Sequence, residues 1–258
     1  MKSTCSLALL VATGALFVTG VPLRGSDTDD RIESSAKKSY VFKTYLKDDS
    51  IKTESKNGVV TLTGTVAAES HKSLAENTVA GLPGVKSVDN HLKIKGESPA
   101  ENSDTWICMK VKTALLFHRN VSAGETDVYV KDGIVTLRGT ANSLAQRDLT
   151  SEYARDVEGV KSVKNEMTTA GTAVKPAETI GEKVDDASIT AQVKMSLMSH
   201  RSTSALKTKV ETTDGVVTVS GIAKNAAEKS LVTKLVNDIK GVNSVVNLMT
   251  IAALLIAN

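Results

Sequence analysis

The sequence is poor in aromatic residues, which make up 3% of the chain, and it holds only two cysteines and four prolines. So few aromatic rings argue against the stacking platforms that bind single-stranded nucleic acid. The formal net charge of +3 is far from the concentrated basic surface that binds a phosphate backbone. We therefore expect no nucleic-acid partner.

The two cysteines exclude several kinds of site. Cys5 lies ahead of an apolar run and follows no Leu-x-x motif, so attachment of a lipid to it is not indicated. Cleavage of the N-terminal segment that carries Cys5 would leave Cys108 as the only thiol. A single thiol excludes an intramolecular disulfide and a cysteine-rich zinc site. Because Cys108 lies beside Ile107 on an apolar helix face, we expect a buried, inert thiol.

Familiar catalytic motifs are missing as well: there is no Gly-x-Ser-x-Gly, Walker loop, His-Glu-x-x-His or dinucleotide fingerprint. The chain has four histidines and contains a unit that is repeated three times. His118 in "FHRN" and His200 in "SHRS" hold equivalent positions in two of these repeats. Such positions are far apart unless the repeats stack, so we expect exposed side chains and not a shared metal site. The prediction is a protein that is not an enzyme, with no catalytic residue, no metal and no cofactor.

The N-terminus has the pattern of a secretory signal peptide. Met1 and Lys2 give a short positive start, Leu7 to Val21 form a nearly unbroken apolar run, and small or short residues at 18–20 suit cleavage by a signal peptidase. We expect residues 1–20 to be cleaved and the mature protein to begin near Val21. An uncleaved membrane anchor is the alternative.

One octet recurs three times: "NGVVTLTG" at 57–64, "DGIVTLRG" at 132–139 and "DGVVTVSG" at 214–221. The turn glycines Gly58, Gly133 and Gly215 follow Asn or Asp, as a tight hairpin turn with positive φ requires. After each turn, apolar residues alternate with threonine, which predicts a strand with one buried face and one wet face. We interpret these threonines as the open face of a sheet and not as a ligand site.

The spacing around the octet defines a unit of about 70 residues, as expected for a repeat. An isoleucine stands 26 residues before each turn glycine and heads a helical pattern, and 26 residues after it comes a second glycine, Gly84, Gly159 or Gly241. Between them lies a second helix with one apolar stripe, for example Leu74, Ala75 and Val79. We expect the second glycine to end this helix in a left-handed conformation.

The fold class is therefore α+β, with three tandem αββαβ domains, each a three-stranded sheet with two helices on one face. The expected domains are 28–96, which departs most from the pattern, 103–171, and 185–258 with an apolar C-terminal extension. Polar, proline-containing linkers at 97–103 and 172–185 predict separable units arranged as beads on a string. The extension "IAALLIAN", 251–258, is too short to span a bilayer and is expected to extend a strand or cover a surface, with an interface or membrane contact as the alternative.

A third feature recurs in the closing strand, where Asn90, Asn165 and Asn247 share the parity of inward residues. Because a buried asparagine must be hydrogen-bonded, we expect bonds to nearby backbone, with ligand contact as the alternative.

The combination of Asp-Gly-Val-Val-x-Leu-x-Gly, a helix, and Gly-Val-x-x-Val-x-Asn-x-Leu/Met resembles the BON domain (bacterial OsmY and nodulation). Three copies behind a signal peptide are similar to the osmotically inducible periplasmic proteins of that family. The resemblance implies a periplasmic or envelope protein that binds phospholipid membranes, or alternatively one that holds unfolded envelope proteins as a chaperone does. Catalysis is not implied.

A lipid-binding surface would need exposed cations. The region of the second helix in the third copy carries four lysines, Lys224, Lys229, Lys234 and Lys240, and its apolar stripe is committed to the core. We expect these lysines to face solvent and to contact anionic phospholipid; the alternative is a charged face that serves solubility.

Overall fold

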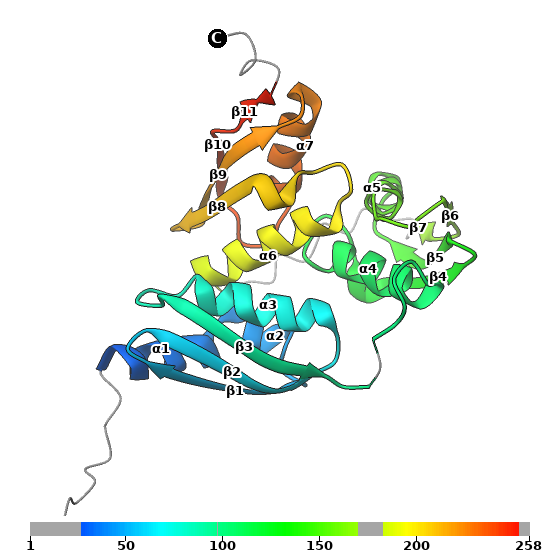
Figure 1. Cartoon of the computed structure of the whole chain (residues 1–258). Helices are drawn as coiled ribbons and strands as arrows, with labels where there is room; N and C mark the ends of the chain where they lie inside the picture. The colour runs from blue at the N-terminus through cyan, green and yellow to red at the C-terminus, as the bar shows by residue number, and fades with distance from the viewer. Residues whose placement is uncertain (1–26, 97, 170–182, 253–258) are drawn as a thin grey trace, which may run out of the picture.

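The computed structural model describes residues 27–96, 98–169 and 183–252, which we call units 1, 2 and 3. The expected signal peptide and residues 253–258 of the C-terminal extension lie outside the described residues. Each unit has the α+β architecture expected, with helices packed on one face of a small sheet (Figure 1).

Unit 1 contains α1 (Asp27–Lys38), α2 (Tyr40–Thr44), β1 (Ser50–Lys56), β2 (Val59–Val66), α3 (Glu69–Ala80) and β3 (Ser87–Ile94). The strand order is β1-β2-β3. The hairpin makes β1 and β2 antiparallel, whereas the α3 crossover makes β2 and β3 parallel.

Unit 2 repeats this order with one uninterrupted first helix. It contains α4 (Asp104–Leu116), β4 (Thr126–Lys131), β5 (Ile134–Ala141), α5 (Leu144–Arg155), β6 (Ser162–Asn165) and β7 (Thr168–Thr169). Unit 3 contains α6 (Asp186–Ser199), β8 (Thr208–Thr213), β9 (Val216–Ala223), α7 (Ala226–Asn237), β10 (Ser244–Asn247) and β11 (Thr250–Ile251). In both units the closing strand is interrupted, and its two pieces pair in parallel with the same central strand.

The central strands follow the expected alternation. Val60 and Leu62 are fully buried, as are their equivalents Val135, Leu137, Val217 and Val219. The tight turn places Asn57 and Gly58 at φ 57° and 81°, and the equivalent residues of the other units are also at positive φ. A Cβ on Gly58 would lie 2.7 Å from the Gly84 carbonyl oxygen, so close packing of two loops also requires glycine there.

The second glycines do not end the helices. Helix α3 ends at Ala80, α5 at Arg155 and α7 at Asn237, each several residues before Gly84, Gly159 or Gly241. These glycines do have positive φ, but they lie in the loop that leads to the closing strand. There a Cβ on Gly84 would meet Thr28 and Ile32 of α1, so the loop passes close to the first helix.

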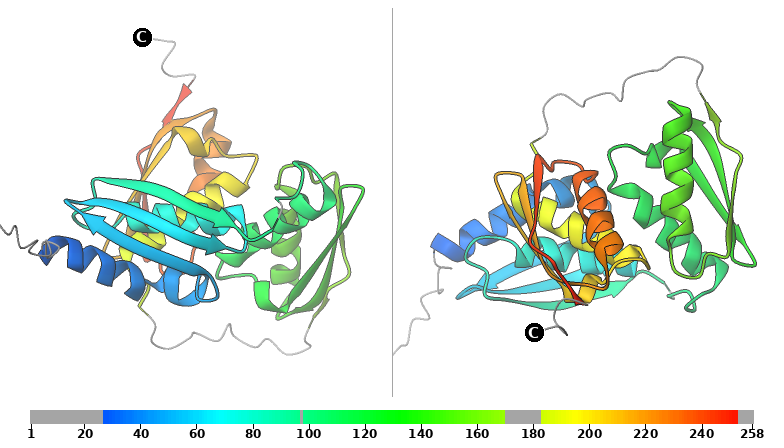
Figure 2. Two further views of the ribbon diagram at one scale, coloured as in Figure 1. Left: turned by 60° about the horizontal axis from the view of Figure 1, so that its bottom comes forward. Right: turned by 90° about the horizontal axis from the view of Figure 1, so that it is seen from above.

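The units do not form beads on a string. Helix α6 packs on the sheet of its own unit and also lies against α3 of unit 1 and α4 of unit 2 (Figures 1 and 2). Eleven of its residues are buried. A helix that is buried all round forms when several layers share it, so α6 is the common core of the three units.

Unit 1 is joined to unit 3 through a broken helix. Ser39 interrupts the first helix of unit 1, and its hydroxyl bonds Ala36 O at 2.7 Å. The backbone N–H of Tyr40 donates to Asp185 Oδ2 at 2.7 Å, and that of Val41 donates to Ser188 Oγ at 3.1 Å. The start of α6 therefore satisfies donors that the break leaves without a helical partner.

Candidate functional site

Units 2 and 3 dock on each other reciprocally. The loop after α4 meets the end of α7, where Arg119 N donates to Asp238 O at 2.8 Å. In the same way the loop after α6 meets the end of α5, where Arg201 N donates to Asp156 O at 2.9 Å. Equivalent loops thus close equivalent helix ends, as a pair of domains related by approximate two-fold symmetry would do.

The two histidines that sequence reasoning separated lie at the centre of this contact. His118 and His200 are 4% and 3% exposed, and their ring centroids are 5.8 Å apart. The ring of Tyr153 stacks on His118 at 4.0 Å between centroids. The expectation of exposed, distant histidines was wrong because it assumed that the repeats do not stack.

Each histidine lies against a carboxylate of the other unit. Nδ1 of His200 is 3.0 Å from Asp156 Oδ2. Nδ1 of His118 is 3.1 Å from Asp238 Oδ2, but not in hydrogen-bonding direction, so among the described residues this buried nitrogen has no hydrogen-bond partner. Asp238 Oδ2 instead accepts a hydrogen bond from the Tyr153 hydroxyl at 2.7 Å.

Burial sets the protonation of this cluster. Desolvation lowers the pKa of His118 below its ordinary value, although Asp238 opposes that shift. Burial also raises the pKa of Tyr153, and the neighbouring Asp238 raises it further. Burial alone would raise the pKa of Asp156, but hydrogen bonds from His200 and Ser202 outweigh it and hold that pKa below its ordinary value.

A chain of contacts in this cluster has the order of a catalytic triad. Ser196 Oγ lies 3.2 Å from His118 Nε2, and Asp238 lies beyond the other ring nitrogen. Ser196 is 1% exposed, however, so no substrate carbonyl can reach its hydroxyl in this arrangement. We interpret the chain as part of the packing between the units. In the described ranges, no group of three or more His, Cys, Asp or Glu side chains is arranged to hold a metal ion.

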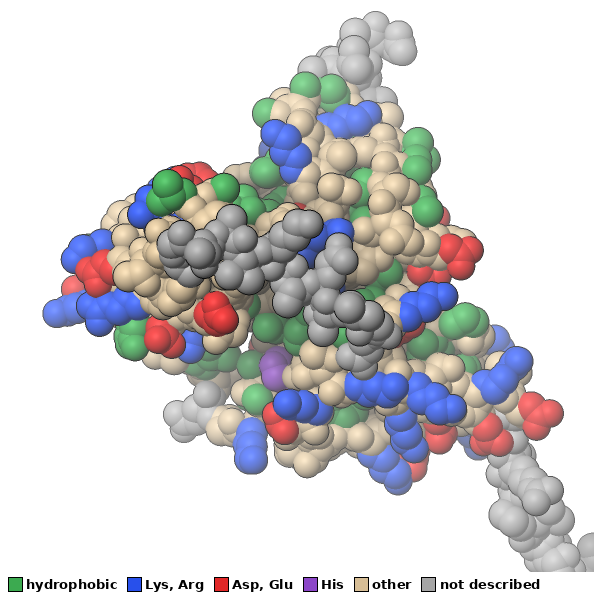
Figure 3. Space-filling model, turned by 180° about the vertical axis from the view of Figure 1, so that it is seen from behind, with side chains coloured by type: hydrophobic (Ala, Val, Ile, Leu, Met, Phe, Trp, Pro, Cys, Tyr) green, Lys and Arg blue, Asp and Glu red, His purple; other side chains and the backbone are tan. Residues whose placement is uncertain are grey.

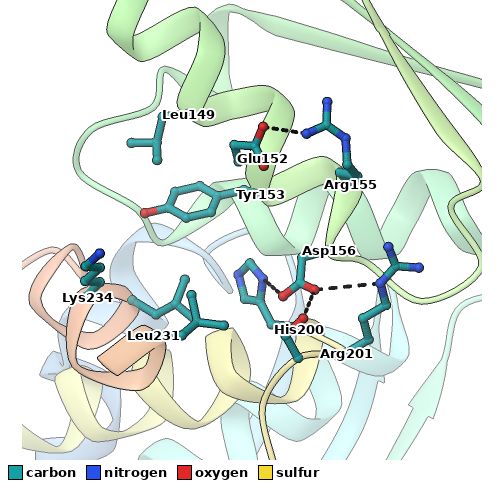
Figure 4. A pocket seen from close by; sticks show the side chains of 11 residues that line it. Leu149, Glu152, Tyr153, Arg155, Asp156, His200, Arg201, Leu231 and Lys234 are labelled. Atoms are coloured by element: carbon teal, nitrogen blue, oxygen red, sulfur yellow. Dashed lines mark hydrogen bonds and ion pairs between the residues drawn. The ribbon is translucent and has the colours of Figure 1, made fainter. Parts of the chain in front are cut away.

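A cavity of about 370 Å³ opens directly beside the histidines, between α5 and α7. Figure 4 shows Leu149 and Tyr153 on one side of it and Leu231 and Lys234 on the other, with His200 at its base. Arg155 and Arg201 also line it. The arginines pair with acids: Arg155 bonds Glu152, and Arg201 lies 3.7 Å from Asp156. The cavity therefore combines leucine side chains with a charged rim.

The four predicted lysines do not share one face. Lys234 lines the cavity and Lys224 is exposed. Lys229 is half-buried and donates from Nζ to Met249 O at 2.7 Å, and Lys240 lies over the Tyr40 ring with Nζ 5.2 Å from its centroid. The expectation that all four face solvent was wrong for Lys229 and Lys240. On the face in Figure 3, lysine and arginine side chains are spread among acidic ones and do not form one continuous patch.

Sequence reasoning missed the arginines of the cavity and one recurring aspartate. Asp29, Asp104 and Asp186 each accept hydrogen bonds from both central N–H groups of the hairpin turn, 28 and 29 residues further on. These bonds lower the pKa of Asp104. The fixed spacing is visible in the sequence and could have been found. No such signal marks Arg155 and Arg201, because different units supply them.

Two further predictions concern single residues. Asn165 donates from Nδ2 to Arg147 O at 2.8 Å and accepts from Met167 N at 2.9 Å, and Asn90 and Asn247 make the equivalent bonds. The expectation of bonds to nearby backbone is confirmed. Cys108 is half-buried, less than expected, with its thiol 3.3 Å from Val128 O.

No helix of the described ranges is long and apolar enough to cross a membrane.

The chain is similar to several proteins over a little more than half its length. It is 32% identical over 145 residues to Osmotically-inducible protein Y of Escherichia coli strain K12. The aligned residues cover 55% of this chain and 72% of that protein. It is 32% identical over 148 residues to the 21 kDa hemolysin of Actinobacillus pleuropneumoniae (54% and 73%). The outer membrane lipoprotein DolP of Haemophilus influenzae is 28% identical over 159 residues (59% and 80%).

The sequence profile of the BON domain matches three times, at residues 28–96, 103–171 and 185–253. These matches contain the three αββαβ units, their hairpin turns and the asparagines of the closing strands. The chain therefore belongs to the BON domain family.

Proposed function

We propose that this BON-domain protein is exported to the cell envelope, has no enzymatic activity, and binds anionic phospholipid surfaces. The observation that carries the proposal is the cavity between α5 and α7, where cationic and leucine side chains occur together. The names of two relatives, an osmotically inducible protein and an outer membrane lipoprotein, support a role at the envelope.

The chemistry of the cavity suits the surface of a bilayer. Arg155 and Arg201 have half-exposed side chains, and Lys234 is exposed. Each such cation near an anionic surface contributes about 1 kcal/mol, weakened by salt. Leu149 and Leu231, both partly exposed, offer apolar surface beneath the cations. Glu152 and Asp156 reduce the net charge, so we expect weak binding that depends strongly on salt.

Co-sedimentation with liposomes tests the proposal. The full mature chain should sediment with vesicles of phosphatidylglycerol and phosphatidylcholine, and much less with phosphatidylcholine alone. Replacing Arg155, Arg201 and Lys234 by glutamine should remove most of this binding at low salt. The matched control replaces Lys52, Lys93 and Lys209, three exposed lysines outside the cavity. Equal binding by the two triple variants would assign the cavity no part in lipid binding.

Export is tested separately. N-terminal sequencing of the protein from an envelope fraction should begin near Val21. Recovery of the intact Met1 end from the cytosol would contradict export, whatever the liposome result.

A second candidate function is the holding of unfolded envelope proteins. It is favoured by a second cavity between the units, lined by Trp106 and by methionines of α4 and α6. An assay of client aggregation at substoichiometric protein concentrations separates the candidates, because a lipid-binding protein should leave aggregation unchanged.

A further inference from the structure

The second cavity lies where the three units meet and has a volume of about 420 Å³. Unit 1 supplies the start of α3 and the end of β3, unit 2 supplies one face of α4, and unit 3 supplies the end of α6. We call it the methionine groove. Its apolar walls include Ile94, Pro99, Trp106, Met109, Met195 and Met198.

The apolar side chains of this groove are not all explained by packing. Met198 is 50% exposed, and Trp106 and Met109 are only partly buried. Methionine is flexible and polarisable, so methionines around a tryptophan can adapt to an apolar chain of variable shape. The volume lies within the range of pockets that bind small molecules.

Charge at the rim indicates the sign of the ligand. Lys95 and Lys110 line the groove together with one acid, Glu69. Nζ of Lys110 lies 4.8 Å from the centroid of the Trp106 ring, so one cation stands directly beside the apolar wall. An amphiphile with a negatively charged head could place its chain on the methionines and its head near the lysines.

The walls are less suited to an extended peptide. The groove has few strand edges, because most of its lining residues belong to α3, α4 and α6, and along α4 the backbone N–H groups are bonded within the helix. At the end of β3, Lys95 N is already bonded to Val66 O at 2.8 Å. An extended peptide pairs along the edge of a sheet, which the groove offers only at the end of β3, whereas an acyl chain needs no backbone partner.

We infer that the methionine groove binds the acyl chain of a single-chain anionic amphiphile, such as a fatty acid or a lysophospholipid. This inference goes beyond attachment to a membrane surface and does not depend on it, because the groove and the cavity between α5 and α7 are lined by different residues.

Trp106 is the only tryptophan of the chain, so its fluorescence reports on the groove directly. The full mature chain is titrated with dodecanoate below its micellar concentration, and with dodecyl maltoside and dodecyltrimethylammonium as neutral and cationic probes of equal chain length. We expect a saturable blue shift with one molecule bound, and tighter binding of dodecanoate than of the other two probes. No saturable change with any of the three would overturn the inference.

Two variants locate the binding. Met198→Asp should weaken dodecanoate binding about tenfold or more, a loss of about 1.4 kcal/mol, and its exposed position protects the fold. The matched control is Leu248→Asp, because Leu248 is 59% exposed and lies outside the groove. Lys95→Gln should reduce the preference for dodecanoate over dodecyl maltoside.

Unchanged binding by Met198→Asp would overturn the assignment. Quenching of Trp106 fluorescence by an unfolded client protein, without any response to dodecanoate, would show that the groove binds protein clients and not an acyl chain. Liposome binding is measured on the same variants, and its loss or survival bears only on the proposed function.

Discussion

At the scale of single residues, the contact between units 2 and 3 is centred on two buried imidazoles. His118 lies under the Tyr153 ring and beside His200, with Asp238 and Asp156 as the nearest carboxylates. The buried nitrogens His118 Nδ1 and His200 Nε2 have no hydrogen-bond partner among the described residues. A group without a partner in a buried place costs free energy, so this contact is closely balanced.

Acid should weaken this contact through His118. The pKa of His118 is lowered by burial, so the unfolded chain takes up a proton below about pH 6.5 while the folded chain resists it. The stability is therefore complete above that pH and is lost as the pH falls toward the lower, folded value. Asp156, whose folded pKa is also lowered, adds its loss only below about pH 3.8.

Thermal unfolding at pH 7.5 and pH 5.0 checks this expectation. The native chain should be less stable at pH 5.0 than at pH 7.5, because the unfolded chain takes up a proton on His118 that the folded chain resists. The His118→Gln variant should lose less, whereas His91→Gln, which changes an exposed histidine, should behave like the native chain. Equal losses in all three proteins would contradict the role of His118.

Replacing Asn165 should destabilise unit 2. Its amide joins the closing strand to α5 through Arg147 O and Ser151 Oγ, and it also accepts from Met167 N. Asn165→Leu leaves several of these partners unpaired, at a cost of about 1–3 kcal/mol. Asn165→Asp keeps only the acceptor oxygen, so its free energy of unfolding in urea should lie between that of the native chain and that of Asn165→Leu. A leucine variant as stable as the native chain would show that these bonds contribute nothing.

At the scale of elements, α6 is the helix on which the other units assemble. The only charged residue between Ala187 and Ser199 is Lys194, and the sequence there is otherwise apolar or small and polar. Gly81, at the end of α3, allows α6 to approach closely, because a Cβ there would lie 3.3 Å from Cα and Cβ of Ala187. Units 2 and 3 carry Asp156 and Asp238 at the equivalent position.

Gly81→Leu should separate unit 1 from α6 without unfolding it. The φ of Gly81 is −83°, which any residue adopts, so the effect comes from packing alone. Overpacking of this kind costs about 1–3 kcal/mol. Hydrogen exchange should quicken at Tyr40 and Val41, whose N–H groups donate to unit 3. Gly124→Leu, in open space, is the control; protected amides in both variants would show that the contact tolerates the side chain.

At the scale of the whole molecule, the three repeats form one assembly with two kinds of contact. Units 2 and 3 pair through equivalent loops and helix ends, whereas unit 1 packs on α6 through its broken helix and α3. Unit 1 has Lys43 where the others have His118 and His200. It therefore lacks the residues of the reciprocal contact and attaches differently.

Fragments should reveal how much the units depend on one another. Residues 184–258 alone expose the face of α6 that unit 1 covers, including Ala187, and the histidine that unit 2 covers. We expect this fragment to fold but to be less stable than residues 103–258, which keep the reciprocal contact. Urea unfolding and dye binding measure the difference. Equal stability of unit 3 in the two fragments would show that its core is independent.

The sequence by itself determined the repeated units, because their signals are local. Positive φ at Gly58 and its equivalents, alternation along the central strands and the bonded asparagines all follow from rules that act within about thirty residues. The helix ends were misplaced because Gly84 and its equivalents serve the next loop and not the helix cap.

Only the tertiary structure decided how the units meet. His118 contacts His200, Tyr40 donates to Asp185, and Arg155 shares a cavity with Lys234, although each pair is separated by tens of residues or more. Repeat spacing aligns equivalent residues but carries no information on which unit packs against which. That choice depends on the sum of packing over whole surfaces, and it buried His118 and His200, left Lys229 and Lys240 half-buried, and formed both cavities.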